Sequence, residues 1–501
     1  MKTTFRRLAL FFWVPILLAA QNLQDFEKKV TEFTLANGMH FIVLERKEAP
    51  VVSFHAYVNA GAANDPAGRS GLAHMFEHMI GKGTETVGTK NYAAERKALA
   101  EVEAIYDRLE EERRKEFRAD PKVMEKLQAE LDAAIEKANQ YVEPNEYIRV
   151  IEENGAVGFN AATGFDGTYY FYSLPANRTE LWFLLQSDWF RRPIYREFYK
   201  ERDVVREERR MRVESSPVGK VQEMLLATAF TAHPYRNLVG WGSDIENLRA
   251  TDAEEFFKAY YVPGNITVAI AGDVDPAQIR TLAEKYFGPL PKGPLPPRVR
   301  TIEPVQEGEK RVAVITPSQP FIFIAYHRPD QSHPDDAALD VLSELLSSGR
   351  TGVLYREMVR DRKLALQALS FTPFPSGKYG NLFVLAAAPN QGRTVEENEK
   401  AFYEVIERLK KEPVDEASLA RVRTKVRAGL IRRLDSNSGL AGELASNHAN
   451  YGDWRKMFTS IDEIDKVTVE DVQRVARTYL VESARTVAFT VAPKQEKGDG
   501  K

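Results

Sequence analysis

The sequence predicts an α+β protein made of two homologous α/β-sandwich domains, joined by a proline-rich linker, with a charged helical hairpin inserted in the first domain. The chain has 501 residues, more than one hydrophobic core usually serves. A helix, a turn and a strand begin near Thr251 and again near Thr468, about 217 residues later, as expected for a duplicated unit. Six prolines at residues 288–304 indicate a stiff connection between the copies.

These patterns divide the chain into segments. We expect, in order, a signal peptide, a first domain with an insertion at about 91–147, a linker, a second domain and a polar tail: residues 1–20, 21–287, 288–304, 305–494 and 495–501. Only the first domain carries a candidate metal motif. The histidines of the second domain are scattered along its sequence: His327, His333 and His448.

The N-terminus has the pattern of an export signal. Lys2, Arg6 and Arg7 precede an apolar run at residues 8–20, and polar, charged sequence follows it. The run of about 13 residues is shorter than the roughly 20 that a membrane-spanning helix needs. We expect cleavage near Ala20, and an uncleaved anchor is the alternative. The prediction is a periplasmic or secreted protein with no membrane span after the signal is removed.

Composition excludes several classes of function. Hydrophobic residues make up 43% and charged residues 28% of the chain, which is ordinary for a globular protein. The net charge of −3 gives no electrostatic basis for binding nucleic acid. The chain has no cysteine, which excludes disulfides, thiolate metal sites, a cysteine nucleophile and a lipoprotein anchor.

The elements around the candidate site follow from periodicity. Alternating apolar and polar residues at 30–44 and 51–60 predict paired strands, interrupted by an Asn-Gly turn. Residues 91–147 are rich in Glu, Lys, Arg and Ala, with apolar residues at helical spacing and an Asp-Pro break at 120–121. Two charged helices packed as an antiparallel hairpin are therefore expected. The hairpin is either a partner contact or a solvated structural insertion.

Residues 71–80 carry the strongest functional signal. Their apolar residues recur at helical spacing, and His74 and His78, four residues apart, therefore share one face of a helix. Glu77 can reach the same point in space. Two neutral imidazoles can bind a metal ion and a carboxylate can take a proton from water, which are the needs of a catalytic zinc site. The alternative is two histidines that are packed or solvated without metal.

A second predicted helix, at residues 201–210, offers further carboxylates. Glu201 and Glu208 are seven residues apart and share a face, while Val204 and Val205 would attach the helix to the core. The two carboxylates could supply a third metal ligand and a hydrogen bond to a metal-binding imidazole. Without the histidines they would be ordinary solvated charges. Beside a histidine pair that lacks a third ligand, the metal role is favoured.

These motifs resemble the pitrilysin (insulinase) family of zinc peptidases, in the short two-domain branch that includes mitochondrial processing peptidase. The family block H-[LMF]-x-E-H-[ML]-x-x-K-G-T is matched at residues 74–84, and E-R-x-V-[VI]-x-x-E at 201–208. Residues 233–235 and 261–265 also resemble family blocks. The resemblance covers nearly the whole chain after the signal and implies two sandwich domains of the processing-peptidase type.

The resemblance implies roles for the motif residues. Glu77 would be the general base, and Glu201 would hydrogen-bond a metal-binding imidazole. Glu207 is a competing ligand, but the seven-residue offset from Glu201 favours Glu208. The interval between the histidines and Glu208 exceeds that of the family, and the hairpin accounts for the excess. Three side chains would hold one Zn²⁺ per chain: His74, His78 and Glu208.

The resemblance also implies a substrate site and a partner. Four residues match the family's edge strand, which pairs with the substrate backbone: Gly158, Phe159, Asn160 and Ala161. The alternative is a fully paired core strand. Peptide-cutting members present an Arg and a Tyr, seven apart, from a domain facing the zinc. Arg360 matches the arginine, but Leu366 stands at the tyrosine position and the segment is one residue short. A homologous subunit, in a heterodimer or homodimer, is therefore expected to complete the site.

Together, residues and resemblance predict an exported zinc metalloendopeptidase that hydrolyses short or unfolded peptides. One alternative is a zinc-retaining, non-proteolytic subunit of a larger assembly, which the missing tyrosine favours and the intact motif opposes. The other is a zinc hydrolase that acts on a different substrate with the same fold.

Overall fold

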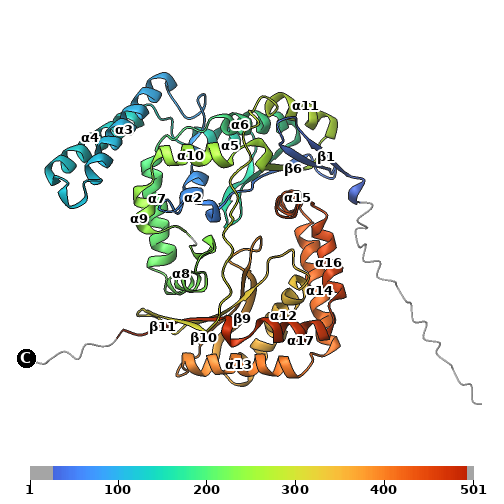
Figure 1. Ribbon diagram of the computed structural model, residues 1–501. Coiled ribbons are helices and arrows are strands. Elements are labelled where there is room, and N and C mark those ends of the chain that lie inside the picture. The colour runs from blue at the N-terminus through green and yellow to red at the C-terminus, as the bar shows by residue number, and fades with distance from the viewer. Residues whose placement is uncertain (1–25, 238, 494–501) are drawn as a thin grey trace, which may run out of the picture.

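The computed structural model describes residues 26–237 and 239–493 and contains two β-sheets flanked by helices (Figure 1). The predicted signal peptide at residues 1–20 and the predicted tail at 495–501 lie outside this described part of the chain. None of the described helices is long and apolar enough to cross a membrane.

The first sheet has the strand order β1-β2-β6-β3-β5-β4. β2 and β6 are parallel, and the other neighbours are antiparallel. β4 lies at one edge, where no other strand of the described residues pairs with its outer side. The strands are β1 (Val30–Thr34), β2 (His40–Glu45), β3 (Val51–Val58), β4 (Val157–Thr163), β5 (Thr168–Pro175) and β6 (Ile266–Gly272).

The turn between β1 and β2 is the reversal that the Asn-Gly pair predicts. Gly38 has a φ of +99°, in the left-handed region that a residue with a Cβ atom rarely adopts. The buried Asn37 side chain donates hydrogen bonds to the backbone oxygens of Phe287, at 2.8 Å, and Leu290, at 3.1 Å. The first hairpin is thereby held to the C-terminal end of the first domain.

The first domain has eight α-helices within the described residues besides the two of its inserted hairpin, and those on one face of its sheet pack on it through aromatic side chains. Phe54 of β3 stacks on Trp182 of α6, with ring centroids 4.7 Å apart. The helices are α2 (Leu72–His78), α5 (Glu146–Glu153), α6 (Thr179–Arg191), α7 (Phe198–Arg209), α8 (Pro217–Ala229), α9 (Gly242–Asn247), α10 (Ala250–Tyr260) and α11 (Pro276–Tyr286). Short 3-10 or π helices are η1 (Ala62–Asn64), η2 (Ile80–Lys82), η4 (Ala176–Arg178), η5 (Arg210–Glu214), η6 (Pro234–Arg236) and η7 (Pro263–Asn265).

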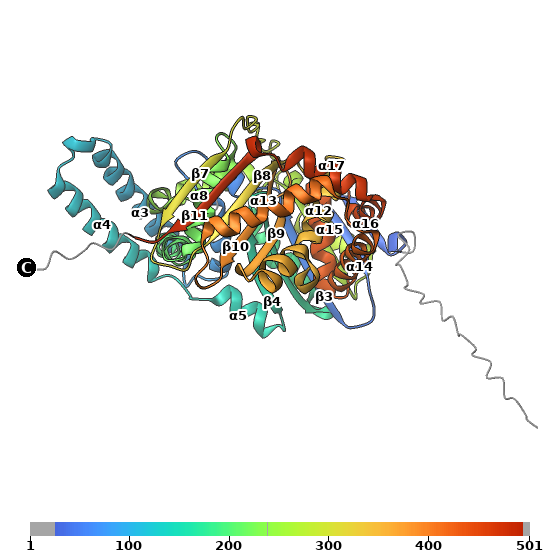
Figure 2. The same ribbon diagram turned by 90° about the horizontal axis from the view of Figure 1, so that it is seen from below.

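The predicted pair of charged helices is present and projects from the first domain (Figures 1 and 2). α3 (Tyr92–Arg113) and α4 (Pro121–Asn139) are joined by η3 (Glu116–Arg118). Asp120 caps α4 by accepting a hydrogen bond from the backbone N–H of Lys122, and Pro121 occupies the first turn. The facing sides of the two helices bury apolar residues: Val102, Leu109, Leu127 and Leu131.

The second sheet has the order β7-β11-β8-β10-β9, with β7 and β11 parallel. Its strands are β7 (Lys310–Ile315), β8 (Ile322–Arg328), β9 (Ala365–Phe374), β10 (Asn381–Pro389) and β11 (Arg485–Val491). Its helices are α12 (Asp336–Ser347), α13 (Val395–Lys411), α14 (Glu416–Arg433), α15 (Asn437–Tyr451), α16 (Lys456–Lys466) and α17 (Val469–Tyr479), with the short η8 (Gly349–Thr351), η9 (Tyr355–Asp361) and η10 (Glu482–Ala484).

Each domain covers the second face of the other domain's sheet with one helix. α8 packs on β7, β8 and β11, whereas α15 packs on β3 and β6, and both helices lie between the sheets in Figure 1. The resulting cores mix residues of the two domains: one contains Leu225 and Phe323, and another contains Ile42 and Leu444. This exchange, with the strand order β2-β6-β3-β5-β4 of the first sheet matched by β7-β11-β8-β10-β9 in the second, confirms the predicted fold class of two related α+β domains.

The segment between α11 and β7 contains no helix or strand. Its Glu303 carboxylate accepts hydrogen bonds from the backbone N–H groups of Thr231, Ala232 and His233 at 2.6–2.9 Å. The segment predicted as a linker is therefore held to the first domain near its end.

Candidate metal centre

α2 presents both motif histidines from one short helix whose other side is buried. The Asp65 carboxylate accepts hydrogen bonds from the backbone N–H groups of Gly71, at 2.7 Å, and Ala73, at 2.8 Å. These contacts hold the first turn of α2, which carries His74 in its middle and His78 at its end. The apolar side of α2 packs into the first core: Leu72, Met75 and Phe76.

α7 brings Glu208 to the two histidines. Glu208 Oε2 lies 3.7 Å from His74 Nε2, and Glu208 Oε1 lies 3.7 Å from His78 Nε2. The two imidazole rings are 4.9 Å apart and nearly perpendicular, at 83°. One potential ligand atom from each of the three residues lies within 4.8 Å of the other two. The three predicted ligands therefore lie close together in the structure, although the inserted hairpin separates them in the sequence. Their role in binding metal stays a prediction.

The orientation of α7 separates the competing carboxylates. Glu207 is half-exposed and pairs with Arg210 one turn further on, and Glu208 alone of the two belongs to the histidine cluster. Val205 is fully buried, but the expectation that Val204 also anchors the helix is wrong, because Val204 is 41% exposed. Consecutive helical residues point about 100° apart, so only one of the two valines can face the core.

The donor set fits a zinc ion. Burial is the largest cause that lowers the pKa of His74 to about 3, and the charges of His78 and Arg212 lower it further. His74 is therefore neutral at pH 7, the state in which imidazole binds metal. Two neutral imidazoles and a carboxylate form one of the donor sets of catalytic zinc sites, which leave a fourth position for water or substrate.

Glu201 supports His78 from behind the cluster. Its Oε2 is 3.3 Å from Nδ1 of His78, and its Oε1 accepts a 2.5 Å hydrogen bond from Lys82 Nζ. Burial alone would raise the pKa of Glu201, but the hydrogen bonds with His78 and Lys82 lower it to about 2. An ionised carboxylate at Nδ1 favours the tautomer with its lone pair on Nε2, the atom that faces Glu208.

Glu77 faces the same cavity from α2. Burial raises the pKa of its carboxyl group, while a hydrogen bond with Thr163 and the charges of His78 and Arg212 oppose that shift. A carboxylate whose pKa is raised toward neutrality is better suited to exchange protons with water and substrate. Its role as general base stays a prediction.

A cavity of about 720 Å³ opens beside the cluster. β4 forms one side, where Asn160 and Ala161 line the cavity and Gly158 and Phe159 do not. Because β4 is an edge strand, the alternative of a fully paired core strand does not hold. The binding role of these four residues stays a prediction. Other lining residues come from α2, α7 and the elements that follow: His74, Glu77, His78, Glu208, Arg212 and Gln222.

Arg360 is not among the described residues that line this cavity. It stands on η9 of the second domain, is half-exposed, and forms a bidentate ion pair with the neighbouring Asp361. Leu366, two residues into β9, is 56% exposed. Neither residue lines the cavity.

Two charged residues of the centre were not predicted from the sequence. Arg212 lies one helical turn after Glu208, lines the cavity, and places its Nη2 2.9 Å from Glu208 Oε2. Lys82 pairs with both Glu197 and Glu201. The four-residue spacing from Glu208 to Arg212 is the signal that could have identified the arginine.

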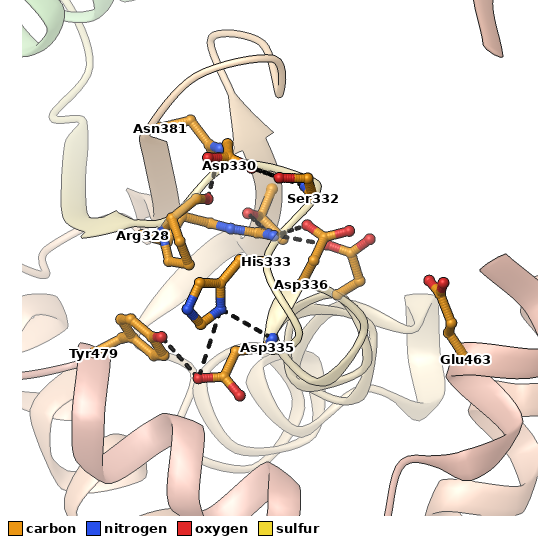
Figure 3. A network of polar contacts seen from close by, with 12 residues as sticks. Arg328, Asp330, Ser332, His333, Asp335, Asp336, Asn381, Glu463 and Tyr479 are labelled. Atoms are coloured by element: carbon orange, nitrogen blue, oxygen red, sulfur yellow. Dashed lines mark hydrogen bonds and ion pairs between the residues drawn. The ribbon is translucent and has the colours of Figure 1, made fainter. Parts of the chain in front are cut away.

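The corresponding region of the second domain is built around an arginine (Figure 3). Arg328, at the end of β8, is fully buried and forms ion pairs with Asp336 and Asp340 of α12. Burial raises the pKa of Asp336, and Arg328 opposes that shift. Where the first domain gathers imidazoles and a carboxylate, the second gathers carboxylates around a guanidinium.

The two-domain scaffold, with the histidine–carboxylate cluster beside an open sheet edge, agrees with the family models that match the chain. The profile of "Insulinase (Peptidase family M16)" matches residues 41–108 and 133–240, and that of "Peptidase M16 inactive domain" matches residues 247–426. The chain belongs to peptidase family M16, the insulinase or pitrilysin family. The first profile passes over residues 109–132, which lie in the projecting hairpin.

Members of the family match most of the chain. "Zinc protease PqqE" of Helicobacter pylori is 27% identical over 487 residues, which are 94% of this chain and 95% of that protein. A crystal structure of a protease from Helicobacter pylori has a TM-score of 0.76 and 25% identity, and the match covers 92% of this chain and 99% of that one. The periplasmic protease PqqL from Escherichia coli shares the fold, with a TM-score of 0.68 at 14% identity, over 93% of this chain and 48% of that one.

Proposed function

We propose that the protein is an exported zinc metalloendopeptidase that cleaves short or unfolded peptides. The observation that carries the proposal is the approach of Glu208 to both imidazoles, beside Glu77 and an open strand edge. The name of the Helicobacter pylori relative, a zinc protease, supports the choice of metal. Export is supported by the N-terminal sequence pattern and by the periplasmic location named for the Escherichia coli protein.

Each residue of the centre has one task in this reaction. His74, His78 and Glu208 would hold the zinc ion, and Glu201 would fix the orientation of His78 through Nδ1. When bound, zinc supplies a lowered water pKa and a Lewis-acid contact for the scissile carbonyl. Glu77 takes a proton from the attacking water as the C–O bond forms, and then delivers it to the amine nitrogen, which lets the C–N bond break and the amine leave. Arg212 lies close enough to the cavity to hydrogen-bond the substrate backbone.

The substrate would bind as an added strand. The outer side of β4 offers backbone N–H and C=O groups to an extended peptide, and Asn160 and Ala161 would place that peptide over the cavity. A folded protein cannot supply a free extended segment without local unfolding. Substrates of this site are therefore short or unfolded chains.

A homologous subunit would complete the site, in a heterodimer or a homodimer. Among the described residues, all that line the cavity belong to the first domain, and the second domain contributes no side chain to it. Arg360 would act, if it acts, at the centre of a partner. The pairing is supported by the fold of the Escherichia coli protein, because this chain matches only 48% of that longer one.

Metal content and peptide cleavage test the proposal together. Full-length protein without the signal is loaded with Zn²⁺, dialysed and analysed for zinc, alone and mixed with a co-expressed homologue, and a quenched-peptide library reports cleavage. Glu208→Ala should lose the zinc of this centre, whereas Glu77→Gln should retain it and lose cleavage. Zinc content unchanged by Glu208→Ala, or no cleavage by the zinc-loaded pair, would contradict the proposal.

A second candidate function is a zinc-retaining, non-proteolytic subunit. The observation that favours it is the match of the second half to the profile named for an inactive domain. This reading predicts normal zinc binding with no cleavage in any combination of subunits. The same experiment therefore separates the two functions.

A further inference from the structure

A second histidine–carboxylate cluster lies where the two domains meet. Glu32 on β1, His40 on β2 and His448 on α15 each offer one potential ligand atom, and these atoms lie within 4.8 Å of one another. All three residues are half-buried. Among the described residues, the only other cluster that satisfies this criterion is that of His74, His78 and Glu208.

The distances within the cluster suit metal ligands. His40 Nε2 is 3.5 Å from Glu32 Oε2, compared with 3.7 Å between each motif histidine and Glu208. Ligand atoms about 2.0–2.2 Å from a tetrahedral zinc ion are about 3.3–3.6 Å apart. The imidazole of His448 stacks on that of His40, with ring centroids 3.9 Å apart and planes at 6°. Parallel rings do not direct their lone pairs to one point, so binding turns one imidazole out of the stack.

An unpaired buried nitrogen of the cluster points to a ligand. His40 Nδ1 is 2.9 Å from Thr34 Oγ1, a contact that holds the ring and leaves Nε2 on the side of Glu32. His448 Nδ1 is buried and has no hydrogen-bond partner within the described part of the chain, whereas His40 Nε2 has the Glu32 carboxylate 3.5 Å away. A buried polar nitrogen without a partner is unfavourable, and a cation shared with His40 and Glu32 would satisfy the nitrogen of His448.

The charges around the cluster favour a cation. Arg455, after α15, contacts three carboxylates: Glu27 at 2.5 Å, Asp453 at 3.0 Å and Glu32 at 3.3 Å. One guanidinium therefore faces three carboxylates, and the surplus is negative. Imidazole and carboxylate donors together match Zn²⁺ better than Mg²⁺ or Ca²⁺, which prefer oxygen ligands alone.

We propose that Glu32, His40 and His448 bind a zinc ion that links the first sheet to α15 of the second domain. The site is distinct from the centre on α2, and it does not depend on peptidase activity. Because its ligands come from both domains, zinc bound there stabilises the contact between the first sheet and α15. The covered core beneath contains Ile42 and Leu444, which connect the site to the packing of the two domains.

Zinc stoichiometry in a background without the first centre tests this inference. The full chain carrying His74→Ala and His78→Ala is loaded with Zn²⁺ alone, dialysed and analysed for bound metal. One zinc per chain is expected, and adding either His40→Gln or His448→Gln should abolish it. Thr34→Val should weaken zinc binding by about tenfold, because it removes the hydrogen bond that orients His40. His333→Gln is the matched control, since His333 lies 3.9 Å from Asp335 but in no described cluster of three ligands.

Two further measurements test the proposed zinc site even if one of these variants folds poorly. Co²⁺ in place of Zn²⁺ should give the visible absorption of a tetrahedral nitrogen–oxygen site, lost in the His448→Gln variant. Zn²⁺ should raise the melting temperature of the background chain and leave that of the His448→Gln chain unchanged. Absence of stoichiometric zinc from a folded background chain, or zinc retained after His448→Gln, would overturn the proposal. The peptidase proposal would stand in either case.

Discussion

The two domains build one scaffold and use its first long connection in opposite ways. In the first domain, α2 follows β3 and directs His74 and His78 to a cavity, where Glu208 meets them. In the second, α12 follows β8, buries leucines, and ties Asp336 to Arg328. The scaffold thus supplies a helix against a sheet in both halves, but the metal centre needs polar residues on the open face of that helix and a facing carboxylate.

The largest expected effect comes from breaking the chemistry of the first domain. Glu77→Gln keeps the side-chain volume and removes the proton acceptor, so peptide hydrolysis should fall by about 10²–10⁴-fold while zinc content stays unchanged. A quenched-peptide assay with zinc analysis measures both. Glu207→Gln, on the exposed side of α7, is the matched control and should keep full activity. Full activity in the Glu77→Gln variant would end the assignment of this carboxylate as base.

The next largest effect is expected from Arg328, the buried arginine of the second domain. Arg328→Met leaves Asp336 buried beside Asp340 without its guanidinium partner. The free energy of unfolding should fall by about 3 kcal/mol, the low end for a broken buried pair, because protonation of Asp336 relieves part of the charge. Urea denaturation measures the change. Arg362→Met breaks an exposed pair with Glu404 and should change stability by less than about 1 kcal/mol. Equal effects of the two substitutions would show that Arg328 is not structural.

A pH effect is expected at the contact between the domains. His55 of β3 is buried against Gly442 of α15, and burial lowers its pKa from the usual 6.5 to about 4. Between pH 6.5 and 4 the imidazole of His55 is protonated in the unfolded chain but not in the folded chain. The free energy of unfolding is therefore highest above pH 6.5 and decreases as the pH falls toward 4. The decrease is at most about 1.4 kcal/mol per pH unit.

The variant His55→Phe isolates this effect. Its ring can pack beside Tyr169 and Phe171, which already lie 5.5 and 5.4 Å from the imidazole. Urea denaturation at several pH values should show a shallower loss of stability than in the parent chain. An unchanged slope in the His55→Phe variant, with His333→Gln as control, would contradict a neutral buried imidazole.

The smallest effect is expected at the tip of the projecting hairpin. Phe117 is 92% exposed, so Phe117→Ser should change the unfolding free energy by less than about 0.5 kcal/mol. Leu127→Ala, inside the same hairpin, should lower it by about 2–3 kcal/mol. A large loss of stability in the Phe117→Ser variant would mean that the tip of the hairpin is packed against other residues rather than exposed.

Local patterns predicted the elements of the first domain well. The helix with His74 and His78, the break at Asp120 and the paired strands before the motif all depend on spacing within about 20 residues, where periodicity is informative. The fold class followed from the repeated order of elements. The prediction that Val204 faces the core was wrong, because the sequence does not show which of two adjacent apolar residues points inward.

Contacts between segments far apart in the chain could not be predicted from such local sequence patterns. The exchange of α8 and α15 joins residues from different domains, and nothing in either helix states which sheet it covers. His448 looked isolated in the sequence, yet the fold brings it onto His40. Arg212 is the exception, since its spacing from Glu208 was visible and only its role required the structure.

Anomalous diffraction at the zinc edge, from crystals of the zinc-loaded full chain, tests the central claim most directly. We expect a full-occupancy zinc peak in contact with His74 Nε2, His78 Nε2 and the Glu208 carboxylate. A well-ordered α2 and α7 without a peak between them would contradict it.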